Sequence, residues 1–512
     1  MTDNPHLEHQ TFKIRQLIDD YRSGRIVTPE FQREYVWKRS KAPRLIDSLY
    51  RGFPISSFLL WQSEQGITAR RKDPRPLKLA VMNWIVDGQQ RIITLSRAMN
   101  GDDGIDVVFN PDEEEFALAN AATRQDSNWI HLSDLWSDNS YRTLRRNLDG
   151  TKNADKREAH FERVRGILDY EIPIVRMVDH SFEDAVDAFT RINTLGVRLK
   201  KEDIESAQVA AKHSGFIADE VTPFLRMIRE KGFSRLNVMH LFRVCAFVAK
   251  PDGRDRTPLH ELTRSQVLSA WNDTKKGTET ALGLIRSELG LVNMNILWSG
   301  ALVVPIIALC TTKSARERDP LALAGWLALA ALCRRYSGSS ETALDQDLKA
   351  CRSDDAIGGL LGNLRWMRDL RAKERDFSGA LADRNGLLTL YIACLNKGIR
   401  DFYTGGKVLL QENVDKHHIL PRGQFSEARR STADNIANMA FITGEINKSI
   451  GQTGPEVYLA RLPSRVLRSQ CIPEAPEMWR VSEADWFWKA RRNLLAESFN
   501  DFVRKALPQR KL

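Results

Sequence analysis

The hydrophobic pattern of the chain changes character twice, near residues 210 and 400, and this limits what it can fold into. Up to about residue 210, short apolar runs alternate with helical periodicity, which favours a mixed α/β domain. Residues 215–400 are rich in Leu, Ala and Arg with few strand signals, which is typical of a helical bundle. Residues 401–512 bring paired histidines and clustered asparagines. We therefore predict a helix-rich α+β protein with three domains, 1–212, 213–400 and 401–512.

Two uncharged stretches in the middle of the chain are predicted to be buried helices. Residues 289–312 include Asn293 and Pro305, and Leu321–Leu332 is too short to cross a bilayer.

The first residues have no basic segment followed by an apolar one, so we expect no signal peptide and no membrane partner. The six cysteines are too far apart for a zinc knuckle. A disulfide framework is not expected in a chain of this length either, which favours a reducing cytoplasm. A net charge of +10 permits a polyanionic partner without proving one.

The most informative chemistry lies near the C-terminus. The run Asp415-Lys416-His417-His418-Ile419-Leu420-Pro421 is followed by Asn438 and then by Asn447. Hydrolysis of a phosphodiester needs a general base and a divalent cation. A histidine can act as the base, and the side-chain oxygen of an asparagine can bind the cation. Adjacent histidines on a strand point to opposite faces. A bare histidine pair on a surface loop is the alternative interpretation.

These residues, in this order, resemble the HNH (ββα-metal) nucleases, and in detail the C-terminal domain of the GmrSD family of modification-dependent restriction enzymes. There a D/E/H-H-I-x-P strand precedes an I-x-N-L-x-x-L-T strand and a helix with Asn. The resemblance implies that His418 is the general base, that His417 and Asn447 bind Mg²⁺ or Mn²⁺, and that Asn438 braces the hairpin. Lys448 would steady the phosphate. Many relatives have an acidic residue at the position of His417, which leaves the preferred metal open.

A second constellation, Asp87-Gly88-Gln89-Gln90-Arg91, lies between an apolar strand and an amphipathic helix. One interpretation is a helix start in which Asp87 is the N-cap and Gln90 completes a capping box. The other is a phosphate site at a helix N-terminus with an added arginine. The residues alone favour neither.

With Gln32-Arg33 before it and Asn193-Thr194 after it, this turn resembles the DGQQR-containing ParB/sulfiredoxin-like domain of the same GmrSD family, whose relatives include SspE-like and BrxU-type enzymes. The resemblance implies a site for a nucleoside triphosphate, whether GTP, ATP, CTP or UTP, and hydrolysis of that nucleotide. No Walker A motif is present, so such an NTPase is not a P-loop enzyme. The implied nucleotide-binding residues are Asp87, Gly88, Gln89, Gln90, Arg91, Gln32, Arg33, Asn193 and Thr194.

Three further expectations concern surface segments. The basic loop with Arg70, Arg71 and Lys72 could follow DNA phosphates or be a solvated hairpin tip. In the terminal helix 486–505, the tryptophans are expected to pack under the nuclease domain, while Arg491 and Arg492 could meet DNA phosphate. The charged, poorly periodic segment 112–165 predicts a loop-rich insertion.

Together these features predict a cytoplasmic, metal-dependent DNA endonuclease of the type IV restriction kind. An NTP-hydrolysing sensor would recognise modified phage DNA in double-stranded form, and the central bundle would couple sensor to nuclease. A homo-oligomer is compatible with the sequence. Two alternatives stay open: an SspE-like nickase or nuclease paired with a phosphorothioate mark on host DNA, and a non-catalytic ParB-like DNA-binding regulator.

Overall fold

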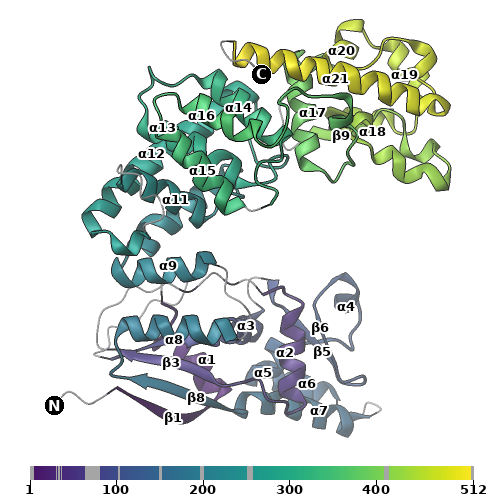
Figure 1. Ribbon diagram of the computed structural model, residues 1–512. Coiled ribbons are helices and arrows are strands. Elements are labelled where there is room, and N and C mark those ends of the chain that lie inside the picture. The colour runs from purple at the N-terminus through teal and green to yellow at the C-terminus, as the bar shows by residue number, and fades with distance from the viewer. Residues whose placement is uncertain are drawn as a thin grey trace. The chain divides into compact units, whose positions relative to one another are not determined.

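The computed structural model describes residues 5–29, 32, 35, 37–63, 81–101, 104–148, 153–195, 201–250, 258–338, 340–408 and 414–508. The chain divides into two compact units, Met1–Thr222 and Pro223–Leu512. The first combines sheets with helices, and the second is built largely of helices (Figure 1). The expectation of a helix-rich α+β protein is therefore confirmed at this level.

A five-stranded mixed sheet organises the first unit, in the order β1-β8-β3-β4-β2. Its strands are β1 (His6–Lys13), β8 (Glu171–Val178), β3 (Phe58–Ser63), β4 (Met82–Asp87) and β2 (Ile26–Val27). The pairs β1–β8 and β3–β4 are antiparallel, while β8–β3 and β4–β2 are parallel. Strand β4 thus lies next to the edge of the sheet, and it leads directly into the Asp87–Arg91 turn.

Amphipathic helices pack on this sheet and enclose its core. They include α1 (Ile14–Arg22), α2 (Lys41–Tyr50) and α3 (Gln89–Asn100). In α2 the apolar residues Leu45, Ile46, Leu49 and Tyr50 are all buried. They share one hydrophobic cluster with residues of α1, α3 and the strands. After β8 the chain continues through α8 (Phe182–Leu195), α9 (Lys201–Lys212) and the π-helix η3 (Phe216–Val221).

The prediction of a loop-rich insertion at 112–165 is wrong, because this segment is regular. Three short antiparallel strands are joined by helices: β5 (Val107–Asn110), β6 (Glu115–Leu118), β7 (Ile130–His131), α4 (Ala121–Gln125), α5 (Leu132–Trp136), α6 (Asp138–Leu148) and α7 (Ala154–Gly166). The two longest helices bury only two residues each, Tyr141 and Leu148 in α6 and Phe161 and Val164 in α7. In α7 so narrow an apolar face leaves little helical periodicity in the sequence.

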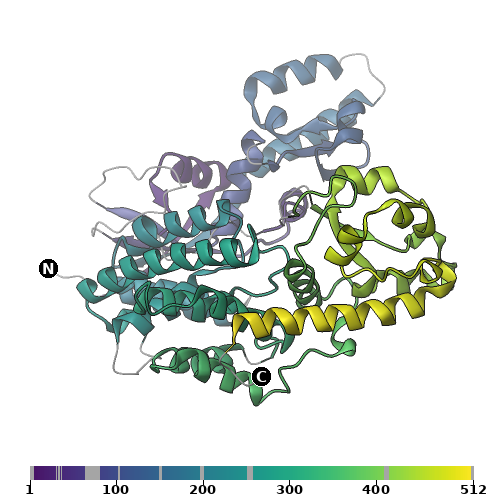
Figure 2. The same cartoon turned by 90° about the horizontal axis from the view of Figure 1, so that it is seen from above.

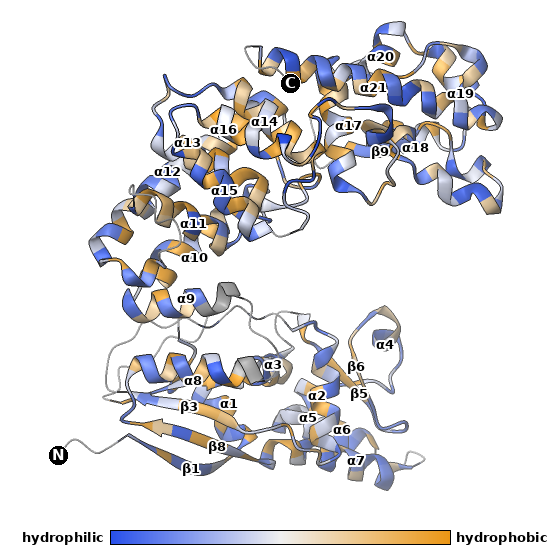
Figure 3. Cartoon of the chain, viewed as in Figure 1, coloured by the Kyte–Doolittle hydropathy of each residue, from blue (hydrophilic) through white to orange (hydrophobic). Residues whose placement is uncertain are grey.

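Helices pack around an apolar interior in the first part of the second unit. They are α10 (Thr222–Glu230), α11 (Val238–Ala249), α12 (Arg264–Leu289), α13 (Val304–Thr312), α14 (Pro320–Leu332), α15 (Ser340–Cys351), α16 (Ala356–Arg365) and α17 (Arg384–Asn396). Helices α13 and α14 are buried along most of their length, and α14 appears as an apolar helix in Figure 3. The prediction of a buried helix is confirmed for 321–332 and for the end of 289–312, whereas residues 290–299 are not helical. Among the described residues, no helix is both long and apolar enough to cross a membrane.

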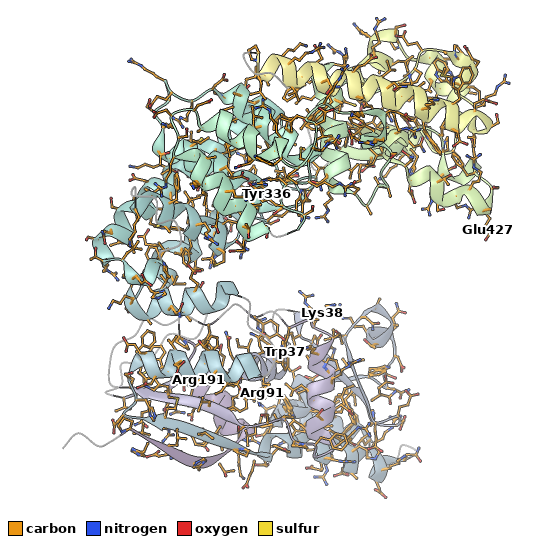
Figure 4. The ribbon with its side chains drawn as sticks, viewed as in Figure 1. Trp37, Lys38, Arg91, Arg191, Tyr336 and Glu427 are labelled. Atoms are coloured by element: carbon orange, nitrogen blue, oxygen red, sulfur yellow. The ribbon has the colours of Figure 1, made fainter. Side chains whose placement is uncertain are left out.

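A buried polar cluster sits inside this helical region. The Asp347 carboxylate is fully buried on α15 and accepts hydrogen bonds from Arg335 (3.0 Å) and from the Tyr336 hydroxyl (2.6 Å). Asn363 on α16 donates a further hydrogen bond of 2.8 Å. Burial and the neighbouring carboxylate together raise the pKa of Tyr336, which is labelled in Figure 4. A buried charge with this many donors is satisfied, so it specifies how α15 and α16 pack.

The rest of the second unit contains a hairpin, β9 (Val414–His418) and β10 (Met439–Thr443), followed by α18 (Gly444–Ile450). Short helices come next, α19 (Pro455–Tyr458) and α20 (Ser464–Ser469), before the long terminal helix α21 (Ala484–Ala506). Figure 2 shows α21 running along this unit, and it packs against α14 and α17 of the helical region. Helix α21 therefore packs against both the hairpin segment and the helical region.

Candidate functional site

The two adjacent histidines lie at the end of β9 and face opposite ways. In the hairpin His417 pairs with Ala440 and His418 pairs with Met439. Successive residues of a strand point to opposite faces, so the two imidazoles enter different surroundings. His417 is only 3% exposed, whereas a quarter of the His418 side chain is open to solvent. This division between a buried and an accessible histidine is what the sequence predicted for a strand.

His417 contacts the helix that follows the hairpin. Its Nδ1 atom lies 2.9 Å from Oδ1 of Asn447 on α18, and its Nε2 atom lies 3.1 Å from the Tyr458 hydroxyl on α19. Asn447 in turn donates from Nδ2 to the Asp415 carboxylate at 3.0 Å, which directs its Oδ1 atom toward His417. Burial lowers the pKa of His417 to about 4, so the ring is neutral near pH 7.

The contacts of the Tyr458 hydroxyl are compatible with hydrogen on Nε2 of His417. The Tyr458 hydroxyl donates to the backbone oxygen of Ile419 at 2.7 Å, so its oxygen can accept from Nε2–H of His417. In that tautomer the Nδ1 lone pair faces the lone pairs of Asn447 Oδ1 across 2.9 Å. Two acceptors converging in this way suit a bound cation. With hydrogen on Nδ1 instead, His417 would donate to Asn447 Oδ1, and the Tyr458 hydroxyl could still donate to Ile419 O.

This pair offers two protein ligands for a metal, one nitrogen and one oxygen. Within the described part of the chain, no group of three or more His, Cys, Asp or Glu side chains could hold a metal. A two-ligand site fits an ion that keeps several water molecules and binds substrate phosphates, as Mg²⁺ does. The partners of the ligands, Asp415 and Tyr458, orient them from behind, as second-layer hydrogen bonds do in metal sites.

On the opposite face of the strand, His418 has an acidic partner. Its Nε2 atom lies 2.9 Å from Oδ1 of Asp434, the last residue of the 3₁₀ segment η8 (Glu427–Asp434). The guanidinium of Arg422 lies 3.8 Å from the other oxygen of that carboxylate. An accessible imidazole oriented by a carboxylate is suited to accept a proton from water.

Asn438 braces the loop that follows the histidines. It is fully buried; its Nδ2 atom donates to Leu420 O (3.0 Å) and Ala433 O (2.9 Å), and its Oδ1 atom accepts from Leu420 N (2.9 Å). The peptide groups on either side of Asn438 are held by Arg491 of α21, which donates to the oxygens of Ala437 and Met439 at 2.7 Å. These bonds fix the segment between the two strands.

The N-terminal turn follows β4 directly. Gly88 is the N-cap of α3 with φ of +101°, and no side chain caps the helix. The interpretation of Asp87 as N-cap of a capping box is therefore wrong. Asp87 instead forms an ion pair with Arg91 one helical turn later, at 2.8 Å. Added at Gly88, a Cβ atom would overlap the Phe58 ring, so only glycine fits this turn without strain.

Arg91 is engaged with the protein backbone. Its guanidinium donates to Ile55 O (2.5 Å) and Ser57 O (2.9 Å) and lies over the ring of Phe58. Burial lowers its pKa, although Asp87 acts in the opposite direction. Gln90 accepts a hydrogen bond from the backbone of Trp37 at 3.2 Å, and Figure 4 labels Trp37 and Arg91 in this unit. The buried Gln32 likewise donates to the oxygens of Ile85 and Val86. These contacts join β4, α3 and the segment before α2.

Comparison with known proteins identifies the first unit. Residues 14–210 match the family model of the N-terminal domain of GmrSD restriction endonucleases. The chain carries a GmrSD N-terminal domain. An uncharacterized protein of Methanocaldococcus jannaschii is 23% identical to the chain over an alignment of 541 residues, covering 89% of this chain and 87% of the relative.

Some of the site residues predicted for the GmrSD domain lie within the described part of the structure, and others lie outside it. Asp87, Gly88, Gln89, Gln90, Arg91 and Gln32 meet around the β4–α3 turn. Asn193 and Thr194 belong to the last turn of α8, with side chains outside the described set. Arg33 and the loop with Arg70, Arg71 and Lys72 lie outside the described residues. Nucleotide and DNA binding by these residues stays a prediction.

In the second unit, the hairpin and α18 bring His417, His418, Asn438 and Asn447 together, and Lys448 is exposed on α18. The prediction that Arg491 could meet DNA phosphate is wrong, because its side chain is fully buried. Arg492 pairs with Glu374 at 2.6 Å. Trp488 is buried and stacks on Phe425, as expected, whereas Trp486 is half exposed.

Sequence reasoning did not single out Asp434 or Tyr458. Asp434 lies 16 residues after His418, and Tyr458 lies 41 residues after His417. Three residues separate Asp434 from the basic pair Arg429-Arg430, and the Asn435–Asn438 run follows at once, so Asp434 resembled an ordinary polar loop residue. Both residues are assigned to the site only by the structure, in which the chain folds back against the hairpin and brings them next to the histidines.

Proposed function

We propose that this chain is a metal-dependent DNA endonuclease of the restriction type. The observation that carries the proposal is the two-sided end of β9, where His417 faces Asn447 and His418 faces Asp434. His417 and Asn447 could hold a divalent cation and His418 is an accessible, oriented base, and the two imidazoles lie close enough for the charge of His418 to help lower the pKa of His417. The GmrSD domain in the same chain supports DNA as the substrate.

In this mechanism His418 accepts a proton from a water molecule at its Nδ1 atom. The resulting hydroxide forms a bond to phosphorus while the bond from phosphorus to the leaving oxygen breaks, and that oxygen gains a proton from solvent. Bound by His417 and Asn447, Mg²⁺ or Mn²⁺ would neutralise charge that develops on the phosphate. Lys448, exposed on α18, would add positive charge near the phosphate. Asn438 keeps the strand ends in register for this arrangement.

We further propose that the N-terminal unit selects modified DNA and binds a nucleoside triphosphate at the β4–α3 turn. In support, this turn places the N-terminus of a twelve-residue helix beside Arg91 and the two glutamines. The backbone contacts of Arg91 hold the shape of the turn, and the helix N-terminus favours an anion. Restriction of modified phage DNA is the biological role that follows from these two activities.

The test is a cleavage assay on unmodified DNA, DNA with glucosylated hydroxymethylcytosine and phosphorothioated DNA. Each is incubated with Mg²⁺ or Mn²⁺, with and without a mixture of nucleoside triphosphates, beside the His418→Ala variant. We expect one modified DNA to be cut by the wild type and to survive with the variant, while phosphate release from the nucleotides is unchanged. Cleavage that His418→Ala leaves intact would contradict the assignment of the base.

A further inference from the structure

The partner of His418 dictates which of its nitrogens is free. A carboxylate can only accept hydrogen bonds, so the 2.9 Å contact between Asp434 Oδ1 and His418 Nε2 requires hydrogen on Nε2. The neutral ring then carries its lone pair on Nδ1. We propose that Asp434 is a positioning residue that holds His418 in this tautomer, with Nδ1 ready to take the proton of water. The proposal rests on the nuclease function proposed above.

Asp434 is itself held in place from the helical region. Its backbone oxygen accepts a hydrogen bond from Leu381 at 2.6 Å, Ala380 forms a β-bridge with Asn435, and Ile436 donates to Gly379 at 2.8 Å. The side chain of Ile436 fills a notch formed by Gly379 and Gly386, where a Cβ atom added to either glycine would collide with it. The strand-like segment 379–381 therefore fixes the backbone that presents the carboxylate. We name this segment the strap.

Arg422 makes the carboxylate hard to replace by an amide. It lies 3.8 Å from Asp434 Oδ2, on the side away from His418. In an Asp434→Asn variant the amide oxygen would turn toward this guanidinium, because a cation attracts the oxygen and repels the NH₂ group. The NH₂ group would then donate to Nε2 of His418. That contact forces hydrogen onto Nδ1, the atom that should accept the proton of water.

This reasoning predicts an unusual order of variants. Asp434→Asn keeps the shape of the side chain but imposes the wrong tautomer, so kcat for DNA cleavage should fall on the order of 10²–10³-fold. Asp434→Ala removes the partner and leaves both tautomers accessible, so it should lose only about 10-fold to 10²-fold, as removal of supporting partners does. DNA affinity should stay unchanged in both. A merely structural carboxylate would give the opposite order, since asparagine fills the space better than alanine.

The experiment uses the full chain and whichever DNA of the three-DNA panel the wild type cuts, with Asp485→Asn as the matched control. Asp485 forms an exposed ion pair with Arg429 in the same unit and should tolerate the change. In parallel, ¹⁵N NMR of histidine-labelled protein at about pH 8.5, above the ordinary histidine pKa, reports the tautomer, with the His418 signals assigned by their loss in His418→Ala. We expect hydrogen on Nε2 in the wild type and on Nδ1 in Asp434→Asn.

Hydrogen on Nδ1 of His418 in the wild type, or Asp434→Asn cutting as fast as Asp434→Ala or faster, would overturn the proposal. The NMR result stands even if no DNA in the panel is cut. If His418→Ala cuts like the wild type, the assignment of His418 as the base fails, and the role of Asp434 fails with it. If His418→Ala is inactive while Asp434→Asn is active, only the role of Asp434 fails.

Discussion

Arg491 should be one of the most costly side chains to remove from the second unit. Its guanidinium is fully buried and donates to three backbone oxygens, Ala437 (2.7 Å), Met439 (2.7 Å) and Gln470 (2.9 Å). Burial lowers its pKa, which reflects the cost of desolvating the charge. We predict that Arg491→Met leaves three buried oxygens without donors.

The expected size of the effect follows from these contacts. A hydrogen bond to a charged group contributes roughly 1.5–3 kcal/mol, which gives an upper bound of about 4.5–9 kcal/mol for three bonds. The desolvation cost of the arginine works against this sum, and breaking buried charged networks costs about 3–5 kcal/mol in practice. We therefore expect the free energy of unfolding of this unit to fall by about 3–5 kcal/mol.

The neighbouring residue supplies the control. Arg492 is on the same helix but forms one ion pair with Glu374 in a partly exposed setting, so Arg492→Met should cost about 1 kcal/mol or less. Urea unfolding gives the stabilities, and hydrogen exchange of peptides covering β10 locates the loss. Equal destabilisation by the two variants, or unchanged exchange in β10, would refute the view that Arg491 holds the hairpin.

Three other predictions follow from the same kind of contact. Tyr458→Phe removes the hydroxyl behind His417, so Mn²⁺ affinity measured by calorimetry should fall about 10–100-fold, and unchanged affinity would separate Tyr458 from the metal site. Gly88→Ala combines a φ of +101° with overlap of the Phe58 ring, so thermal unfolding should show a loss of about 1–3 kcal/mol in the first unit; full stability would mean that the turn can relax. Asp347→Ala should cost about 3–5 kcal/mol in urea unfolding because it strands the buried arginine and tyrosine, and a loss below 1 kcal/mol would show that water replaces the carboxylate.

The sequence predicted the parts of this molecule whose information is local. The apolar face of α2, the buried α13 and α14, and the opposite orientation of two adjacent histidines all follow from short-range periodicity. The segment 112–165 misled that reasoning because its helices bury so few residues. The need for glycine at position 88 was not visible in the sequence, because it depends on the Phe58 ring of a neighbouring strand.

The candidate site shows the same limit. His417, His418, Asn438 and Asn447 were identified because they follow a fixed order along the chain. Asp434 and Tyr458 carry equally specific contacts, yet they are ordinary polar and aromatic residues until the backbone returns to the hairpin. Arg491 was expected at a phosphate because arginine on a terminal helix is usually exposed, and only tertiary packing shows that it is internal.

The strap also limits which fragment of the chain could carry the proposed nuclease site into other proteins. A fragment that began at residue 401 would leave behind Gly379 and Gly386, and Ile436 would lose the notch that receives it. It would also leave behind Ala372, whose backbone exchanges two hydrogen bonds with Asn500 of α21. A portable cutting module for engineered fusions must therefore start ahead of Ala372, and it must keep both glycines even where they look like dispensable small residues.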